Sequence, residues 1–163
     1  MSTTLPTTSS TARPGALGSP ALRSARDVVL LVARVGLGVL MIGHAWLMFT
    51  LGGSSPTGVG QMFAQIGVPF PTLAGLANVL LESVGGVAMI VGLAVPVVGV
   101  LMALNMVGAW VLVHTSALYA MDRNGPETVI AIGLLGLVLA VTGSGRFGLD
   151  HLILQRRRPR TGA

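Results

Sequence analysis

The chain has 163 residues, of which 52% are hydrophobic and only 9% are charged. A soluble domain carries about 25% charged residues, so ten arginines and five acids are too few to cover the surface of a water-soluble globule. The composition therefore excludes an ordinary soluble protein and predicts an integral membrane protein. The absence of cysteine also excludes disulfides and thiolate metal sites within the chain.

The net charge of +5 comes mainly from the two ends of the chain. Arg34 and Arg123 lie among the apolar stretches, and the other arginines flank them, as Arg13, Arg23, Arg26, Arg146, Arg156, Arg157, Arg158 and Arg160. Positive charge on both flanks predicts that both termini lie in the cytoplasm of a bacterial cell. Anionic lipid head groups are secondary candidate partners. A nucleic acid is not expected, because no folded nucleic-acid-binding module accompanies the arginines.

Residues 1–27 are expected to form a disordered cytoplasmic tail, because they are rich in Ser, Thr, Pro and Ala and show no apolar period. The first apolar run covers residues 28–51. It is longer than the core of a secretory signal, which has about 7–15 residues, so we expect it to stay as a membrane anchor.

Further apolar runs follow at residues 73–95, 97–118 and 127–143, with Pro96 in a tight turn between the first two of these. Four spans place both ends of the chain on the same side of the membrane. The predicted fold class is all-α, an integral membrane four-helix bundle over residues 28–152, followed by a basic cytoplasmic tail at residues 153–163. In the first outer loop, Val59, Met62, Phe63 and Ile66 recur at helical spacing and predict a short interfacial helix.

Polar side chains inside a bilayer are costly, so each needs a partner or a function. Counting about 1.5 Å per residue from the cytoplasmic ends places four of them in the outer half of the membrane, about 20–25 Å along their helices. These are His44, Asn78, Glu82 and His114, with Asn105 as a further uncharged polar residue. The matched depth predicts a functional site. The alternative is that these residues only hydrogen-bond neighbouring helices and specify packing.

Arg34 lies about 9 Å from the inner end of its helix by the same count. It either extends to the cytoplasmic surface or forms a buried ion pair with Glu82, and both alternatives stay open. A bis-histidine haem on His44 and His114, or zinc on these two residues and Glu82, is less favoured. We therefore assign no metal site and no catalytic residue.

Several segments resemble the DoxX family of small four-helix bacterial membrane proteins. The first apolar run carries Arg34 and, ten residues later, His44. The first outer loop reads GVGQMFAQIGVPFP. The second apolar run reads LLESVGGVAMIVGL, in which Glu82 is the acidic residue. The resemblance spans residues 27–152. Its most specific part is the closing signature, formed by Gly143, Gly145, Arg146, Phe147, Leu149 and Asp150.

The resemblance implies a membrane partner in redox chemistry, because some family members belong to thiosulfate:quinone oxidoreductases and others to oxidative-stress complexes. The leading hypothesis is a membrane subunit or anchor of a redox complex, in which His44, Asn78, Glu82 and His114 bind a quinone head group and relay protons. The chain shows no electron carrier of its own, so a redox enzyme subunit is its expected partner. Further copies of the chain are another candidate partner. The alternative hypothesis is a non-catalytic membrane scaffold.

Overall fold

The computed structural model describes residues 19–115 and 125–157. Within these ranges the chain forms helices and no strands. The helices are α1 (Pro20–Leu51), α2 (Pro56–Gln65), α3 (Pro71–Val91), α4 (Val95–Leu112), α5 (Glu127–Thr142) and α6 (Leu149–Arg157). The all-α fold predicted from the sequence is confirmed.

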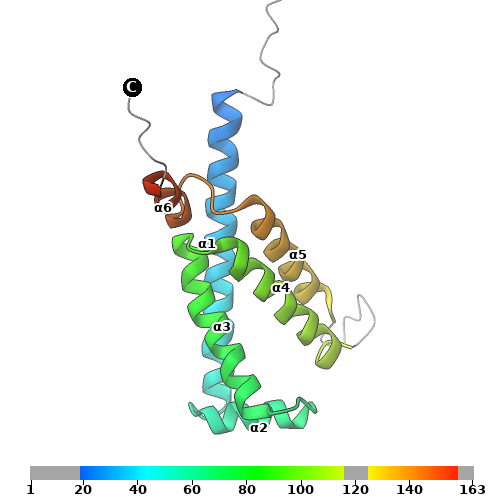
Figure 1. Ribbon diagram of the computed structural model, residues 1–163. Coiled ribbons are helices and arrows are strands. Elements are labelled where there is room, and N and C mark those ends of the chain that lie inside the picture. Colours follow the sequence, from blue (N-terminus) through cyan, green and yellow to red (C-terminus); the bar gives the residue numbers. More distant parts are fainter. Residues whose placement is uncertain (1–18, 116–124, 158–163) are drawn as a thin grey trace, which may run out of the picture.

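The helices form two antiparallel pairs, α1 with α3 and α4 with α5 (Figure 1). The short α2 crosses one end of the first pair, as expected for the predicted interfacial helix. The α3–α4 turn and α6 lie together beside α1 at the opposite end, and the first turns of α1 project beyond them (Figure 1). We call these the α2 end and the terminal end. From the α3–α4 turn, α4 diverges from α3 towards the α2 end (Figure 1).

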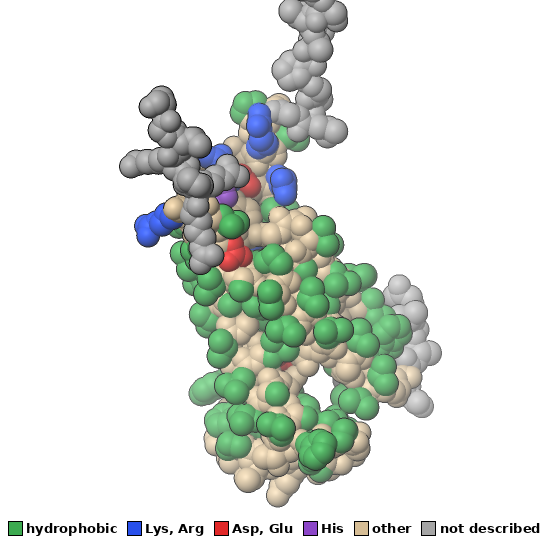
Figure 2. All heavy atoms as spheres, viewed as in Figure 1, with side chains coloured by type: hydrophobic (Ala, Val, Ile, Leu, Met, Phe, Trp, Pro, Cys, Tyr) green, Lys and Arg blue, Asp and Glu red, His purple; other side chains and the backbone are tan. Residues whose placement is uncertain are grey.

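The outer surface of the bundle is apolar, as the membrane prediction requires. Three helices, α1, α3 and α4, are long and apolar enough to cross a membrane. The fourth bundle helix, α5, is apolar but has only 16 residues. Hydrophobic side chains are spread over the whole visible face of the bundle, while arginines and most of the visible acids gather at the terminal end (Figure 2). This distribution suits a lipid-embedded bundle with one polar end.

Two predicted boundaries are wrong. α1 begins at Pro20 rather than at residue 28, so residues 20–27 are helical and not part of a tail. The side chain of Ser19 accepts a hydrogen bond from the backbone of Leu22, and Pro20 occupies the first turn, which is good helix-start chemistry. At the other end, α6 continues to Arg157, into the segment expected to be a tail.

The turn between α3 and α4 also lies earlier than predicted. α3 ends at Val91, and Gly92 caps it in the left-handed conformation, with φ of 74°. α4 then begins at Val95, and Pro96 occupies its first turn instead of the turn between the helices. The third predicted run ended at residue 118, and its last residues lie outside the described part of the chain.

Paired glycines bring the helices of each antiparallel pair into close contact. A Cβ on Gly38 of α1 would lie 2.5 Å from the carbonyl oxygen of Gly86 in α3. Likewise, a Cβ on Gly99 of α4 would lie 2.5 Å from the carbonyl oxygen of Gly136 in α5. Without a large hydrophobic force between helices in lipid, close backbone approach is a main source of association. These crossings set the spacing at which polar side chains between the helices can meet.

Candidate functional site

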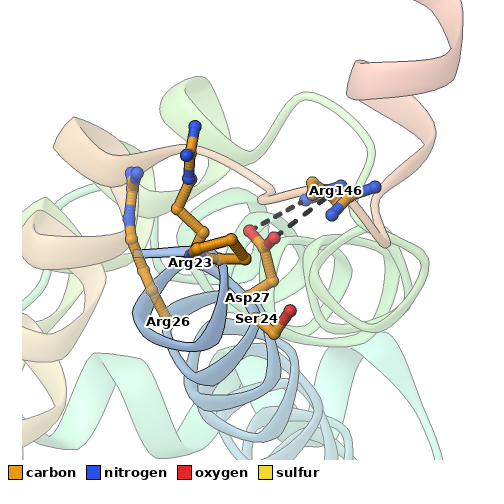
Figure 3. A pocket seen from close by; sticks show the side chains of 6 residues that line it. Arg23, Ser24, Arg26, Asp27 and Arg146 are labelled. Carbon is orange, nitrogen blue, oxygen red and sulfur yellow. Dashed lines mark hydrogen bonds and ion pairs between the residues drawn. The ribbon is translucent and has the colours of Figure 1, made fainter. Parts of the chain in front are cut away.

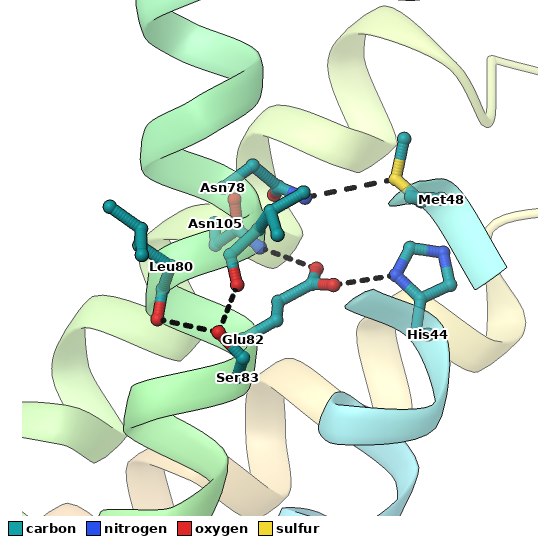
Figure 4. Close-up of polar contacts among 8 residues, drawn as sticks. His44, Met48, Asn78, Leu80, Glu82, Ser83 and Asn105 are labelled. Carbon is teal, nitrogen blue, oxygen red and sulfur yellow. Dashed lines mark hydrogen bonds and ion pairs between the residues drawn. The ribbon is translucent and has the colours of Figure 1, made fainter. Parts of the chain in front are cut away.

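A buried carboxylate joins three helices near the middle of the bundle. Glu82 of α3 has a side chain that is 1% exposed, and its Oε2 lies 2.7 Å from Nδ1 of His44 on α1. Nδ2 of Asn105 on α4 donates to Oε1 at 3.1 Å. Figure 4 shows both side chains directed at the two carboxylate oxygens. We call His44, Glu82 and Asn105 the Glu82 cluster.

The Glu82 cluster connects the interior of the bundle with its surface. The side chain of His44 is 50% exposed, whereas that of Glu82 is closed off on every side. A ring N–H of histidine is the natural donor to a carboxylate, so with Nδ1 turned inward the second ring nitrogen, Nε2, is on the outer side of the ring. His44 is therefore a half-exposed side chain in direct contact with a buried acid.

Asn78 lies one helical turn from Glu82, on the same seam between α1 and α3. Its Nδ2 donates to Sδ of Met48 at 3.7 Å, and Met48 follows His44 by one turn of α1 (Figure 4). A thioether is a weak acceptor, so this amide can turn to a stronger acceptor at little cost. Asn78 thus offers a donor close to the Glu82 cluster.

His114 follows the last turn of α4, where its backbone N–H donates to the carbonyl of Ala109. It lies nine residues beyond Asn105, a rise of about 13 Å in a helix. Among the described residues, Glu82 bonds to His44 and Asn105. The structure therefore brings His44, Asn78 and Glu82 together and places His114 further towards the α2 end.

Arg34 is completely buried and lies near the terminal end, away from Glu82. Its Nη1 donates to the carbonyl of Met89 at 3.5 Å, two turns along α3 from Glu82. Nε and Nη2 have no hydrogen-bond partner among the described residues. The guanidinium group packs beneath the α3–α4 turn, where a Cβ on Gly92 would collide with it. Within the described chain, Arg34 and Glu82 form no ion pair.

Asn105 belongs to the cluster, although the sequence predicts it only as a further uncharged polar residue and not as part of the site. It lies in an otherwise apolar run, and no local pattern pairs it with Glu82, 23 positions away. In the parts of the chain that the structure describes, no group of three His, Asp or Glu side chains could hold a metal ion.

Comparison with known proteins identifies relatives among bacterial membrane proteins. The family model named DoxX matches residues 29–115. CatD of Bacillus subtilis (strain 168), which carries the provisional name of an oxidoreductase, is 29% identical over 132 residues, covering 81% of this chain and 92% of CatD. The inner membrane protein YphA of Escherichia coli (strain K12) is 28% identical over 135 residues, covering 78% of this chain and 92% of YphA. No solved structure matches the chain.

Proposed function

The chain belongs to the DoxX family. On this basis we propose that it is the membrane subunit or anchor of a redox complex, with the Glu82 cluster as its functional site. The observation that carries this proposal is the 2.7 Å contact between half-exposed His44 and buried Glu82. The complex would act in sulfur-compound oxidation or in defence against oxidative stress. A partner subunit would supply the electron carrier, since the sequence contains no carrier motif.

In this proposal His44 and Glu82 move protons. Histidine can take a proton at one ring nitrogen and release it at the other, which makes it a proton carrier near neutral pH. Nδ1 faces Glu82, so Nε2 would exchange protons with a ligand at the bundle surface. Asn105 holds the second carboxylate oxygen and keeps Glu82 oriented towards the ring.

The donors at this seam fit the head group of a quinone. Quinone carbonyl oxygens accept hydrogen bonds. The amide of Asn78 can donate one, and the imidazole of His44, whose Nδ1 faces Glu82, can donate one from Nε2 when both ring nitrogens carry protons. These two side chains would hold the head group, and His114 would serve as a further polar group towards the α2 end. A bound quinone supplies two-electron, two-proton chemistry; the residues of this chain would orient it and deliver protons.

The space-filling view supports access to this region. An opening passes between the α4–α5 pair and the part of the molecule formed by α2 with the adjoining ends of α1 and α3 (Figure 2). It arises because α4 diverges from α3 towards the α2 end. An apolar molecule dissolved in the bilayer could approach the seam from this side without crossing an aqueous phase.

Direct binding tests the proposal. The full chain, purified in detergent, is titrated with menaquinone and compared with His44→Ala, Glu82→Gln and Asn78→Ala. Loss of a hydrogen bond to the head group weakens binding roughly tenfold, and we expect this for His44→Ala and Asn78→Ala. Glu82→Gln should also weaken binding, because it replaces the carboxylate that holds His44 in place. His151→Ala, which changes a histidine of α6 at the terminal end, is the matched control. Equal menaquinone binding by all variants would overturn the quinone site.

A second function is favoured by the same three-helix contact. Hydrogen bonds between membrane helices each contribute about 1 kcal/mol, so the Glu82 cluster could serve only to join α1, α3 and α4. The chain would then be a non-catalytic scaffold. In that case Glu82→Gln lowers thermal stability in detergent and leaves the redox phenotype of the cell unchanged. Affinity purification from native membranes separates the two functions: a dehydrogenase or dismutase partner supports the redox subunit, and recovery of the chain alone supports the scaffold.

We further propose that the protein lies in the cell membrane of a bacterium with both termini in the cytoplasm. The support is the collection of arginines at the terminal end, where Arg23, Arg26 and Arg146 line one surface region. Cytoplasmic ends of membrane proteins carry an excess of arginine and lysine. The α2 end, with its short amphipathic helix, would face the outside.

A further inference from the structure

An open cavity of about 460 Å³ lies at the terminal end, between the first turns of α1 and the loop that joins α5 to α6. We call it the terminal groove. It is lined by Pro20, Arg23, Ser24, Arg26, Asp27 and Arg146. Figure 3 shows Arg23 and Arg26 extending from α1, with Arg146 reaching in from the loop on the other side of Asp27. None of these residues takes part in the Glu82 cluster.

The terminal groove is positively charged, with three guanidinium groups and one carboxylate. Both oxygens of this carboxylate contact Arg146 in the α5–α6 loop. Oδ1 of Asp27 accepts a hydrogen bond from the backbone N–H of Arg146 at 3.4 Å, and Oδ2 lies 3.9 Å from Nε of Arg146. Asp27 is almost buried, whereas the side chain of Arg146 is 69% exposed. Asp27 thus positions Arg146 and leaves most of its donors directed outward.

The terminal groove lies where the apolar surface of the bundle begins. Val28 and Val29, which follow Asp27 directly, are exposed apolar residues at the start of that surface. Phe147, which follows Arg146, is also exposed. Arginines therefore lie next to apolar side chains on both α1 and the loop. This arrangement is typical of the boundary between phospholipid head groups and acyl chains.

We propose that the terminal groove binds the phosphate of an anionic membrane phospholipid. The planar guanidinium groups of Arg26 and Arg146 each present paired N–H donors that match two phosphate oxygens. The acyl chains of the same lipid lie along Val29, which shares a face of α1 with Arg26, and along Phe147. The bound lipid joins the start of α1 to the α5–α6 loop on the outer side of the groove. On its inner side, Asp27 joins the same two segments through its contacts with Arg146.

Lipid binding to the purified full chain tests this site. Native mass spectrometry of the protein, released from detergent micelles, measures binding of phosphatidylglycerol and of zwitterionic phosphatidylcholine to the wild type, Arg26→Gln and Arg146→Gln. Arg156→Gln is the matched control, because it removes an exposed arginine of α6 at the same end without touching the terminal groove. A further arm adds inorganic phosphate to the phosphatidylglycerol titration.

We expect the wild type to prefer phosphatidylglycerol, and each groove variant to bind it roughly tenfold more weakly, as for loss of a charge-assisted hydrogen bond. Arg156→Gln should bind like the wild type. An equal loss in Arg156→Gln would show general surface attraction and overturn the groove. Displacement of the lipid by millimolar inorganic phosphate would show a site for free phosphate and overturn the lipid assignment. If Arg146→Gln fails to fold, Arg26→Gln still tests the groove, because Arg26 is exposed and its replacement leaves the core unchanged.

Discussion

The side chain of Asp150 caps the start of α4 at Ala94, because the methyl side chain of Ala94 cannot accept a hydrogen bond. Its Oδ1 accepts the backbone N–H of Ala94 at 2.7 Å, and its Oδ2 accepts that of Val95 at 2.9 Å. The backbone N–H of Asp150 in turn donates to the carbonyl of Gly92 at 3.0 Å. The last residue of the closing signature thus holds the turn between α3 and α4. Without it, these helix-start donors would lack an acceptor at the apolar boundary.

We expect Asp150→Ala to lower the free energy of unfolding by about 1–2 kcal/mol, since it removes the carboxylate that accepts the helix-start N–H groups of Ala94 and Val95. Asp150→Asn keeps one oxygen acceptor and should cost less than Asp150→Ala. Thermal unfolding of the purified protein in detergent, followed by circular dichroism, measures both. Wild-type stability in Asp150→Ala would show that the cap does not stabilise the turn.

Gly38→Ala should destabilise the α1–α3 pair, because the new methyl group would meet the backbone of Gly86 at 2.5 Å. Inserting a carbon into a tight interface costs about 1–3 kcal/mol. Gly36→Ala is the matched control: it lies on the same helix, and a Cβ there has no atom within 4 Å. Both changes raise helix propensity equally, so the difference between the two melting temperatures measures the effect of the contact with Gly86 alone. Equal effects of the two changes would contradict the close crossing.

The contact between His44 and Glu82 predicts energetic coupling. A double-mutant cycle with His44→Ala and Glu82→Gln, measured by thermal unfolding in detergent, should give an interaction energy of about 0.5–1.5 kcal/mol. A second cycle that pairs Glu82→Gln with His151→Ala should be additive, because His151 is on α6 at the terminal end. Additivity in the first cycle would argue against a bond between the two side chains in the membrane.

The proposed orientation can be tested with introduced cysteines, since the native chain has none. Ser54→Cys lies at an exposed position next to α2, and Gln155→Cys lies at an exposed position on α6. A membrane-impermeant maleimide should label Ser54→Cys in intact cells and Gln155→Cys only after the cells are opened. The reverse pattern would place both termini outside the cell.

Much of the fold follows from the order of apolar and polar residues. The start of α5 is an example, because Pro126 and Glu127 form a helix-start pattern before an apolar run, and α5 begins at Glu127. α2 is another, because Val59 recurs with Met62 and Phe63 at helical spacing and is buried against α3. Local sequence decides such features through propensity and periodicity.

The start of α1 was harder to predict, because its first turns are polar. Residues 20–27 contain two arginines and an aspartate, and they resemble the tail before them in composition. They are helical because Ser19 and Pro20 start the helix, and Asp27 then bonds to the α5–α6 loop. The second of these contacts joins residues that are 119 positions apart, so no local pattern could reveal it.

The sequence by itself determined that the chain is a helical membrane protein of the DoxX type with a few polar residues in apolar helices. Only the tertiary structure decided which of these residues meet. Counting along a helix gives the depth of a side chain but not the face it occupies or the angle at which helices cross. Because α4 diverges from α3, Asn105 reaches Glu82 and His114 lies further on. The same crossings bury Arg34 beneath the turn that Asp150 caps.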